Sequence, residues 1–90
     1  MKLWDWKRGA EIKTLTGHSG DINSLTMVNA DILASGGGSW DNTIKLWDWK
    51  TGAEIKTLTG HSSWVEALTM VNADILASGS YDKTIKLWGV

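Results

Sequence analysis

The segment Ile75–Trp88 reads ILASGSYDKTIKLW and decides the fold. Its two ends, Ile75–Ser78 and Thr84–Trp88, are short runs of strand-forming residues, and Ser80–Lys83 between them has the composition of a tight turn. Two such runs around a short turn predict an antiparallel hairpin. The segment Ile32–Trp47, ILASGGGSWDNTIKLW, shows the same pattern with two more residues in the turn. The chain is therefore built from repeats.

The repeat extends well beyond the hairpin. Residues 2–36 and 45–79 agree at 29 of 35 positions. His18 and His61 are 43 residues apart, whereas Trp47 and Trp88 are 41 apart, because the first copy contains the additional pair Gly37-Gly38. Side chains along a strand alternate with period two, so an insertion of two residues preserves their facing. We expect a longer, mobile loop at 36–39 and an unchanged strand register.

Each repeat contains four strand-like runs and no stretch with a sustained helical period. Residues 64–71 are apolar on both alternating faces, residues 75–78 and 84–88 form the hairpin, and the more polar residues 54–59 suit an outer edge. Strict alternation places Val65, Ala67 and Val71 on one face and Trp64, Leu68 and Met70 on the other. The sequence predicts an all-β protein with four antiparallel strands per repeat.

The order of these elements resembles a WD-repeat β-propeller blade. A Gly60-His61 pair precedes the blade and the hairpin closes it on Trp88, while Gly17-His18 and Trp47-Asp48 repeat the signature. A period of about 40–45 residues is typical of this family. The pattern departs from the family in the additional glycines, in Gly89 after Trp88, and in a compact Asn-Ala-Asp turn at 72–74. The resemblance implies two four-stranded blades in residues 1–90, at roughly 5–47 and 48–90.

Two blades cannot close a ring, because propellers contain typically four to eight. We therefore expect a homo-oligomer in which several chains complete one ring. Four chains with eight blades are favoured over three chains with six, since the bulky apolar residues of the inner strands would crowd a narrow axis. The outer strand, residues 11–16, is expected to pair with Thr84–Trp88 of a neighbouring chain.

This arrangement places two copies of one segment in competition. Lys2-Leu3-Trp4 and Lys86-Leu87-Trp88 both fit the third-strand position beside that outer strand. A tight turn ties the C-terminal copy to residues 75–78, so we expect that copy to take the position. Residues 1–5 are then expected to be displaced or disordered.

Four side chains of each repeat invite a chemical interpretation. His61, Ser78 and Asp82 are the residue types of a hydrolytic triad, but no nucleophile elbow surrounds the serine. The resemblance implies instead a structural tetrad that includes Trp88. A buried tryptophan N–H needs an acceptor; serine can accept it and donate to histidine, and histidine can donate to aspartate. In the first repeat the corresponding residues are His18, Ser35, Asp41 and Trp47.

The positions that differ between the repeats indicate where a partner could bind. Five of the six substitutions lie at residues 20–24 against 63–67. The resemblance places the start of the first strand and the residue before the turn aspartate on the top face of a propeller, where partners often bind. The candidate binding residues are Asp21, Asn23, Trp40, Trp64, Glu66 and Tyr81. The alternative is that Trp40 and Trp64 only cap the core or fill the seam between blades.

Composition excludes several other functions. The formal net charge is −1, which argues against nucleic acid or an anionic membrane as a partner. Without cysteine, and with two histidines 43 residues apart, no metal site is expected within a chain. Residues 36–38 lack the lysine and the following helix of a phosphate loop, so we expect no cofactor. The N-terminus lacks the apolar core of a signal peptide, so a cytoplasmic location is expected.

The sequence thus favours a non-catalytic, self-assembling propeller unit, engineered or excised, that acts as a scaffold and offers a top face to a protein or peptide. One alternative is a fragment of a longer natural WD-repeat propeller that binds protein partners. A more distant alternative is a hydrolase that uses Ser78.

Overall fold

The computed structural model describes residues 1–5, 7, 9–38 and 40–90. This part of the chain contains strands and no helix, and thus no helix that is long and apolar enough to cross a bilayer. The strands are β1 (Lys2–Asp5), β2 (Ala10–Thr14), β3 (Ile22–Met27), β4 (Ile32–Gly37), β5 (Ile44–Asp48), β6 (Ala53–Leu58), β7 (Val65–Met70), β8 (Ile75–Ser80) and β9 (Ile85–Gly89).

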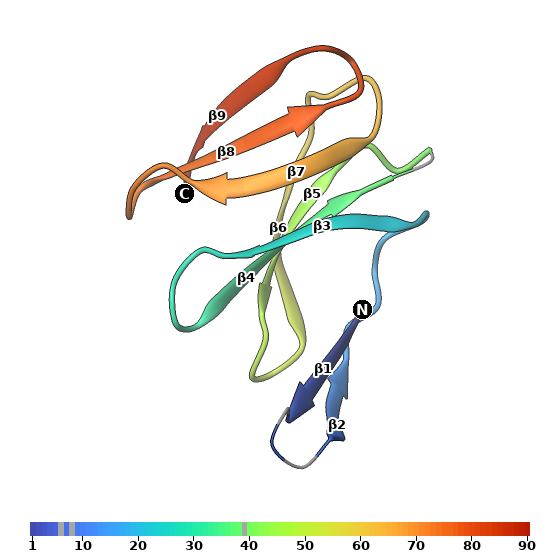
Figure 1. Ribbon diagram of the computed structural model, residues 1–90, viewed down its shortest axis with the longest axis vertical. Coiled ribbons are helices and arrows are strands. Elements are labelled where there is room, and N and C mark those ends of the chain that lie inside the picture. Colours follow the sequence, from blue (N-terminus) through green and yellow to red (C-terminus); the bar gives the residue numbers. More distant parts are fainter. Residues whose placement is uncertain (6, 8, 39) are drawn as a thin grey trace.

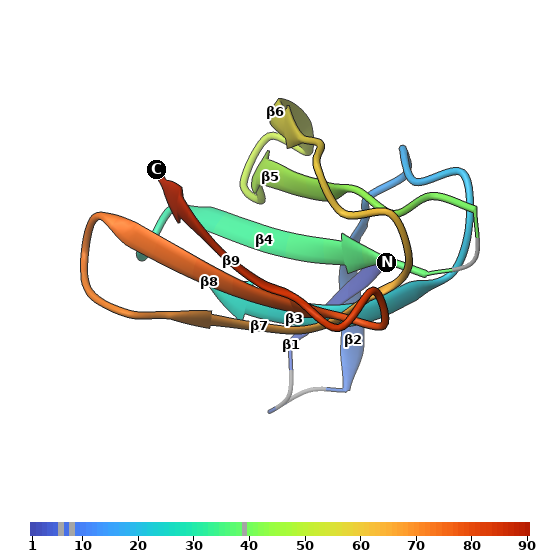
Figure 2. The ribbon, with the colours of Figure 1, turned by 90° about the horizontal axis from the view of Figure 1, so that it is seen from above.

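The strands form three antiparallel sheets in chain order: β1-β2, β3-β4-β5-β6 and β7-β8-β9. Figure 1 shows the sheets in succession along the long axis, with the β1-β2 hairpin at one end and β7-β8-β9 at the other. Seen from above, β7-β8-β9 lies across the four-stranded sheet (Figure 2). The central sheet, residues 22–58, has the predicted four strands in the predicted order, and we call it the central blade.

The two repeats keep the same strand register. Ser35 pairs with Lys45 between β4 and β5, and Ser78 pairs with Lys86 between β8 and β9. The expected register is therefore confirmed. The expected loop at 36–39 is wrong at its start, because β4 continues through Gly37, which is paired with Ile22. A Cβ on Gly37 would lie 2.5 Å from Cγ of Asp41, so the missing side chain makes room for the turn aspartate. Ser39 lies outside the described residues.

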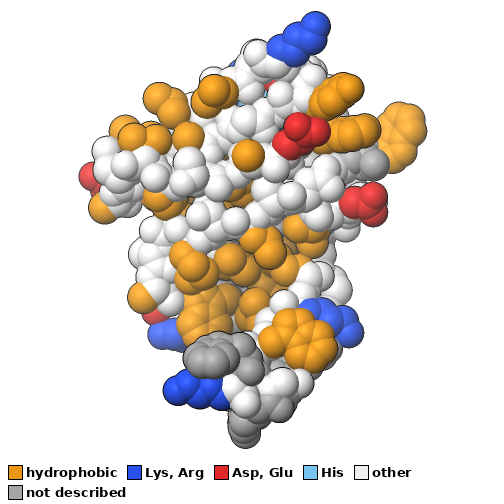
Figure 3. Space-filling model, viewed as in Figure 1, with side chains coloured by type: hydrophobic (Ala, Val, Ile, Leu, Met, Phe, Trp, Pro, Cys, Tyr) orange, Lys and Arg blue, Asp and Glu red, His pale blue; other side chains and the backbone are white. Residues whose placement is uncertain are grey.

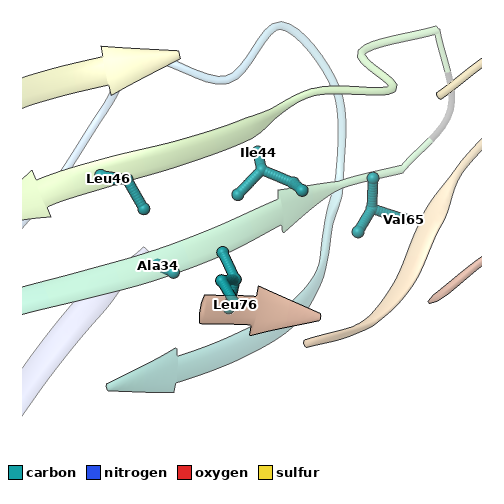
Figure 4. Close-up of a cluster of buried hydrophobic side chains, with 5 residues drawn as sticks. All are labelled: Ala34, Ile44, Leu46, Val65 and Leu76. Carbon is teal, nitrogen blue, oxygen red and sulfur yellow. The ribbon is translucent and has the colours of Figure 1, made fainter. Parts of the chain in front are cut away.

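The core lies in the two seams between the sheets. Ala34, Ile44 and Leu46 of the central blade pack against Val65 and Leu76 of the next sheet (Figure 4). On the opposite face, Leu33 and Trp47 form a second buried cluster with Leu15, against which Met1, Leu3 and Trp49 pack. Successive side chains of a strand point to opposite faces, so one strand supplies both seams. The central blade is thus covered on both sides.

The N-terminal residues form a strand in the single chain, whereas the expected displacement of residues 1–5 concerns the assembled ring and stays a prediction. Lys2 pairs with Thr14 and Asp5 pairs with Ala10. Met1 also accepts a hydrogen bond from the Leu15 N–H at 2.7 Å. Without β1, β2 would have an unpaired edge in the isolated chain. β1 pairs with that edge because it carries the same Lys-Leu-Trp-Asp sequence as β5. The observed outer strand is Ala10–Thr14, shorter than the expected 11–16.

Candidate functional site

The four signature side chains of the second repeat form one hydrogen-bonded chain. Trp88 on β9 donates from Nε1 to Oγ of Ser78 on β8 at 2.8 Å. Ser78 Oγ lies 2.7 Å from Nε2 of His61, which stands in the connection from β6 to β7. His61 Nδ1 lies 2.9 Å from Oδ2 of Asp82 in the β8–β9 turn. Because a carboxylate only accepts, His61 Nδ1–H donates to Asp82, and a neutral ring accepts from the serine.

The first repeat builds the same chain despite its longer turn. Trp47 Nε1 donates to Ser35 Oγ at 2.8 Å, and Ser35 Oγ lies 2.6 Å from His18 Nε2. His18 Nδ1 lies 2.7 Å from Asp41 Oδ2. The structure therefore brings all eight of these residues together in two matching networks, each of which joins a turn, two strands and the segment before the blade.

Each turn aspartate gathers further donors that the sequence analysis missed. Asp41 accepts from the Ser19 N–H at 2.8 Å and from the Thr43 hydroxyl. Asp82 accepts from the Ser62 N–H at 3.0 Å and from the Thr84 hydroxyl. In both turns a threonine follows the aspartate by two residues, and an aspartate commonly accepts hydrogen bonds from the residue two positions later. This spacing could have predicted the additional donors from the sequence.

Hydrogen bonds to the ionised form set the acidity of both carboxyls. Burial opposes ionisation of Asp41, but hydrogen bonds from Thr43, His18 and the Ser19 N–H outweigh it, and the pKa lies below its ordinary value of 3.8. The pKa of Asp82 is lowered further, chiefly by the Thr84 hydroxyl and then by His61. Both aspartates are thus ionised acceptors near neutral pH.

The tetrad serines are closed off from a substrate. Ser35 and Ser78 are both buried. Each hydroxyl accepts from tryptophan and faces histidine, so its hydrogen-bonding capacity is used inside the sheet. The arrangement can fix the turn to the two strands and satisfy the buried polar groups.

The candidate binding residues lie at the end of the sheets that carries these turns. Trp64 and Tyr81 stack with ring centroids 5.1 Å apart and an interplanar angle of 23°, and both rings are exposed. The Tyr81 N–H donates to the Trp64 carbonyl at 3.0 Å, which ties the turn to the segment before β7. Figure 3 shows apolar side chains gathered at this end of the β7-β8-β9 sheet with acidic side chains beside them.

The other candidates share this exposure. Trp40 is 94% exposed, which excludes the alternative that it caps the core of the isolated chain. Asp21, Asn23 and Glu66 are exposed as well. Asp21 accepts a backbone hydrogen bond from Gly38 at 2.6 Å, so the longer turn is tied to the segment before β3. Among the described residues, no group of three histidine, cysteine or acidic side chains is placed to hold a metal ion.

Comparison with known proteins gives this geometry a family. The family model "WD domain, G-beta repeat" matches residues 9–48 and 52–89. Two solved structures are similar at 37% sequence identity over 99% of this chain: the computationally designed Ika4 protein, with a TM-score of 0.83, and the computationally designed Ika8 protein, with a TM-score of 0.82. None of the curated proteins has a matching sequence.

The chain spans only part of those structures, 53% of the Ika4 chain and 27% of the Ika8 chain. The repeat signature, the four-stranded sheet and the family match nevertheless agree over most of the chain, and the resemblance seen in the sequence is confirmed. The chain belongs to the WD domain, G-beta repeat family.

Proposed function

We propose that this chain is a non-catalytic propeller unit that assembles with copies of itself into a closed ring. One observation carries the proposal. Ile44 and Ile85 hold the same position of β5 and β9, yet Ile44 is 0% exposed and Ile85 is 77% exposed. Leu46 and Leu87 differ in the same way. The buried residues lie on a blade that has a neighbour, and their counterparts lie on a blade that lacks one.

The uncovered face of β7-β8-β9 is a sizeable apolar surface. A shallow hollow on it is lined by Ala67, Leu68, Thr69, Ala77, Ser78, Gly79 and Ile85. Exposed apolar patches of this kind mark interaction sites, and removing apolar surface from water is the main favourable contribution to association. A second copy of the chain fits this face, because the central blade and β7-β8-β9 of one chain already pack together in the equivalent way.

The lengths of the similar structures support four copies. The chain corresponds to 27% of the Ika8 chain, close to one quarter, and to 53% of the Ika4 chain, close to one half. We favour a ring of eight blades from four chains, with three chains and six blades as the runner-up. Head-to-tail contacts between equivalent blades give a ring when the rotation closes. The designed origin of both relatives favours an engineered or excised unit.

The tetrads support a scaffold rather than an enzyme. Ser78 is buried and bonded to both Trp88 and His61, so its hydroxyl is not presented to a substrate. The hydrolase hypothesis predicts substrate turnover that a Ser78→Ala variant abolishes. The scaffold hypothesis predicts that the same variant lowers the free energy of unfolding instead.

Absolute mass in solution tests the proposal. Light scattering after size exclusion, over a dilution series, should give four times the chain mass of 9.9 kDa. Ile85→Lys places a charge on the uncovered face and should yield a folded monomer. Thr59→Lys, at a position that is exposed in both repeats, should leave the assembly intact. A wild-type chain that is folded and monomeric at all concentrations contradicts self-assembly. A poorly folded mixture supports the alternative, a fragment whose remaining blades belong to a longer propeller.

A second function, binding of a protein or peptide at the top face, is favoured by the exposed Trp64–Tyr81 stack. Aromatic residues of this kind are enriched among the residues that dominate interface energies. The candidate residues also include two exposed carboxylates, Glu66 and Asp21, which favour a basic peptide. Titration with an arginine-rich peptide should show binding that Trp64→Ala reduces about tenfold or more, and equal binding by both proteins contradicts this site.

A further inference from the structure

The β1-β2 hairpin repeats the pairing of β5 with β6 residue by residue. Lys2 pairs with Thr14 as Lys45 pairs with Thr57, and Asp5 pairs with Ala10 as Asp48 pairs with Ala53. Both pairs of strands shift register between their leucine and tryptophan. β2 is therefore the fourth strand of a blade, and β1 occupies the position of that blade's third strand.

A second strand fits that position better. β9 carries Lys86-Leu87-Trp88, and its outer edge is unpaired in the described chain. Trp88 donates to Ser78, which completes a tetrad, whereas Trp4 is 57% exposed. β1 belongs to a hairpin with no first or second strand, so no serine or histidine of its own blade stands beside Trp4. Two strands of the chain, β1 and β9, thus fit the third-strand position beside the single fourth strand, β2.

We propose that β1 is a stand-in for β9 of a second copy: on assembly β2 releases β1 and pairs with β9 of the neighbouring chain. This inference rests on the self-assembly proposed above and specifies its interface. The expected register sets Thr14 opposite the neighbour's Lys86, as Thr57 stands opposite Lys45. Lys45 Nζ donates to Thr57 Oγ1 at 3.0 Å, and the proposed pairing would place Lys86 and Thr14 in the same relation to each other.

A hollow in the seam between the central blade and β7-β8-β9 supports this occupant. Its volume is about 200 Å³, and it is lined by Val28, Asn29, Ile32, Leu46, Ile55, Lys56 and Val90. Leu46 and Lys56 are the repeat counterparts of Leu3 and Lys13 in the other seam. The hollow therefore has a counterpart in the other seam, beside Leu3 and Lys13, and that counterpart is filled.

In that other seam the turn before β6 fills the space. Lys13 Nζ donates to the carbonyl of Lys50, and a Cβ on Gly52 would lie 3.5 Å from Leu15. Trp49 packs against the same buried cluster as Leu3. The counterpart of Trp49 at the hollow is the smaller Val90, and the counterpart of Gly52 is Gly9 of the neighbouring chain, which also has a positive φ. When that neighbour's β2 pairs with β9, its Gly9 is brought to the hollow.

The strand exchange conserves backbone pairing while covering more apolar surface. Each hydrogen bond that β2 loses to β1 is replaced by one to β9, so the ladder alone favours neither partner. The exchange brings the neighbouring blade over Ile85 and Leu87, both exposed in the single chain. The free energy gained by burying these apolar side chains therefore favours the pairing of β2 with β9 over that with β1.

Engineered disulfides distinguish the two pairings, because the chain has no cysteine of its own. Residues directly opposite in a ladder are within reach of a disulfide. We expect Thr14→Cys with Lys86→Cys to give, on mild oxidation, a covalent ladder of chains up to the mass of the ring. Lys2→Cys with Thr14→Cys should give an intrachain bond in dilute, unassembled protein and little of it in assembled protein. Single-cysteine variants are the controls.

Light scattering on the same samples separates this inference from self-assembly itself. An assembled protein that forms the Lys2–Thr14 bond in full, and no Thr14–Lys86 bond, overturns the strand exchange and leaves self-assembly standing. A monomer at every concentration overturns both. Deleting residues 2–5 provides a second measurement without new side chains: it removes the competing strand and should lower the concentration needed for assembly by about tenfold or more. An unchanged concentration overturns the stand-in role of β1.

Discussion

Gly36 in β4 lies directly against Val65 in β7: a Cβ on Gly36 would stand 2.6 Å from Cγ1 of Val65. The contact joins two neighbouring sheets at Val65, the first residue of β7. Gly79 holds the same position in β8, and nothing lies within 4 Å of the place where its Cβ would be. One glycine therefore faces a blade of its own chain, and the other faces the surface that we assign to a second copy.

Alanine substitution at these two glycines should separate folding from assembly. We expect Gly36→Ala to destabilise the chain by about 1–3 kcal/mol, because the methyl group overpacks the seam. Gly79→Ala should leave the free energy of unfolding of the single chain unchanged or slightly higher, since alanine lowers the entropy of the unfolded state. It should nevertheless weaken assembly by about tenfold or more. Urea unfolding and a dilution series measure the two effects, and full assembly of Gly79→Ala would argue against a tightly packed neighbour.

Removing the tetrad serines tests the structural role of the two networks. Ser35→Ala and Ser78→Ala each leave a tryptophan N–H and a histidine nitrogen without a buried partner. We expect a loss of about 1–3 kcal/mol for each variant in urea unfolding. Ser35 should cost at least as much as Ser78, because its tryptophan, Trp47, is buried whereas Trp88 is partly exposed. Thr59→Ala, at an exposed position, is the control and should have little effect.

The turn aspartates predict how stability depends on pH. The pKa of Asp41 and that of Asp82 are lower in the folded chain than the ordinary value of 3.8. Below that value the unfolded chain binds more protons than the folded chain, so the stabilisation is present above about pH 4 and is lost as the pH falls toward the folded pKa. The urea midpoint should therefore drop between about pH 4 and pH 2. Asp41→Asn and Asp82→Asn should flatten this decline; wild-type and variant profiles of equal steepness would contradict the assignment.

The stacked rings of Trp64 and Tyr81 should contribute to the rigidity of the top face. A double-mutant cycle with Trp64→Ala and Tyr81→Ala is expected to give a coupling energy of about 0.5–1.5 kcal/mol in unfolding free energy. Trp40→Ala is the matched control, because Trp40 is almost fully exposed and should change stability by less than about 0.5 kcal/mol. Additive effects of the two substitutions would mean that the stack is not energetically coupled.

The sequence was sufficient for the features that depend on local chemistry and repetition. The four strands of the central blade follow from the two hairpin runs, the turn signals and the polar outer run. The tetrad itself came from the resemblance to the family. The hydrogen-bonding capacity of the side chains agrees with it, and the structure places Trp88, Ser78 and His61 in the expected order.

The face of β7 shows what alternation alone could not reveal. Simple alternation groups Val65 with Ala67 and Val71, but the structure packs Val65 into the cluster that Leu68 and Met70 contact. A register shift between Val65 and Ala67 moves the first residue of the strand to the other face. No residue in this stretch signals such a bulge, since neither glycine nor asparagine stands there.

Under the strand exchange proposed above, the placement of residues 1–5 depends on more than one chain. Lys2-Leu3-Trp4 and Lys86-Leu87-Trp88 have the same sequence and fit the same position, and the presence of a neighbour would decide which of them occupies it. In the single chain β1 takes the edge of β2, because no competing strand is within reach. Sequence reasoning identified the competition but placed it in the assembled state only.

The pairing of β1 with β2 also has a consequence for the life of a newly synthesised chain. A bare strand edge templates the addition of any extended polypeptide, which is the first step of amyloid-like growth. In this chain β1 covers the edge of β2. Under the strand exchange proposed above, it would yield only to the one partner that also shelters an apolar face. The duplicated segment would then work like an intramolecular chaperone for the edge of β2 while the copies of the chain are too few to associate.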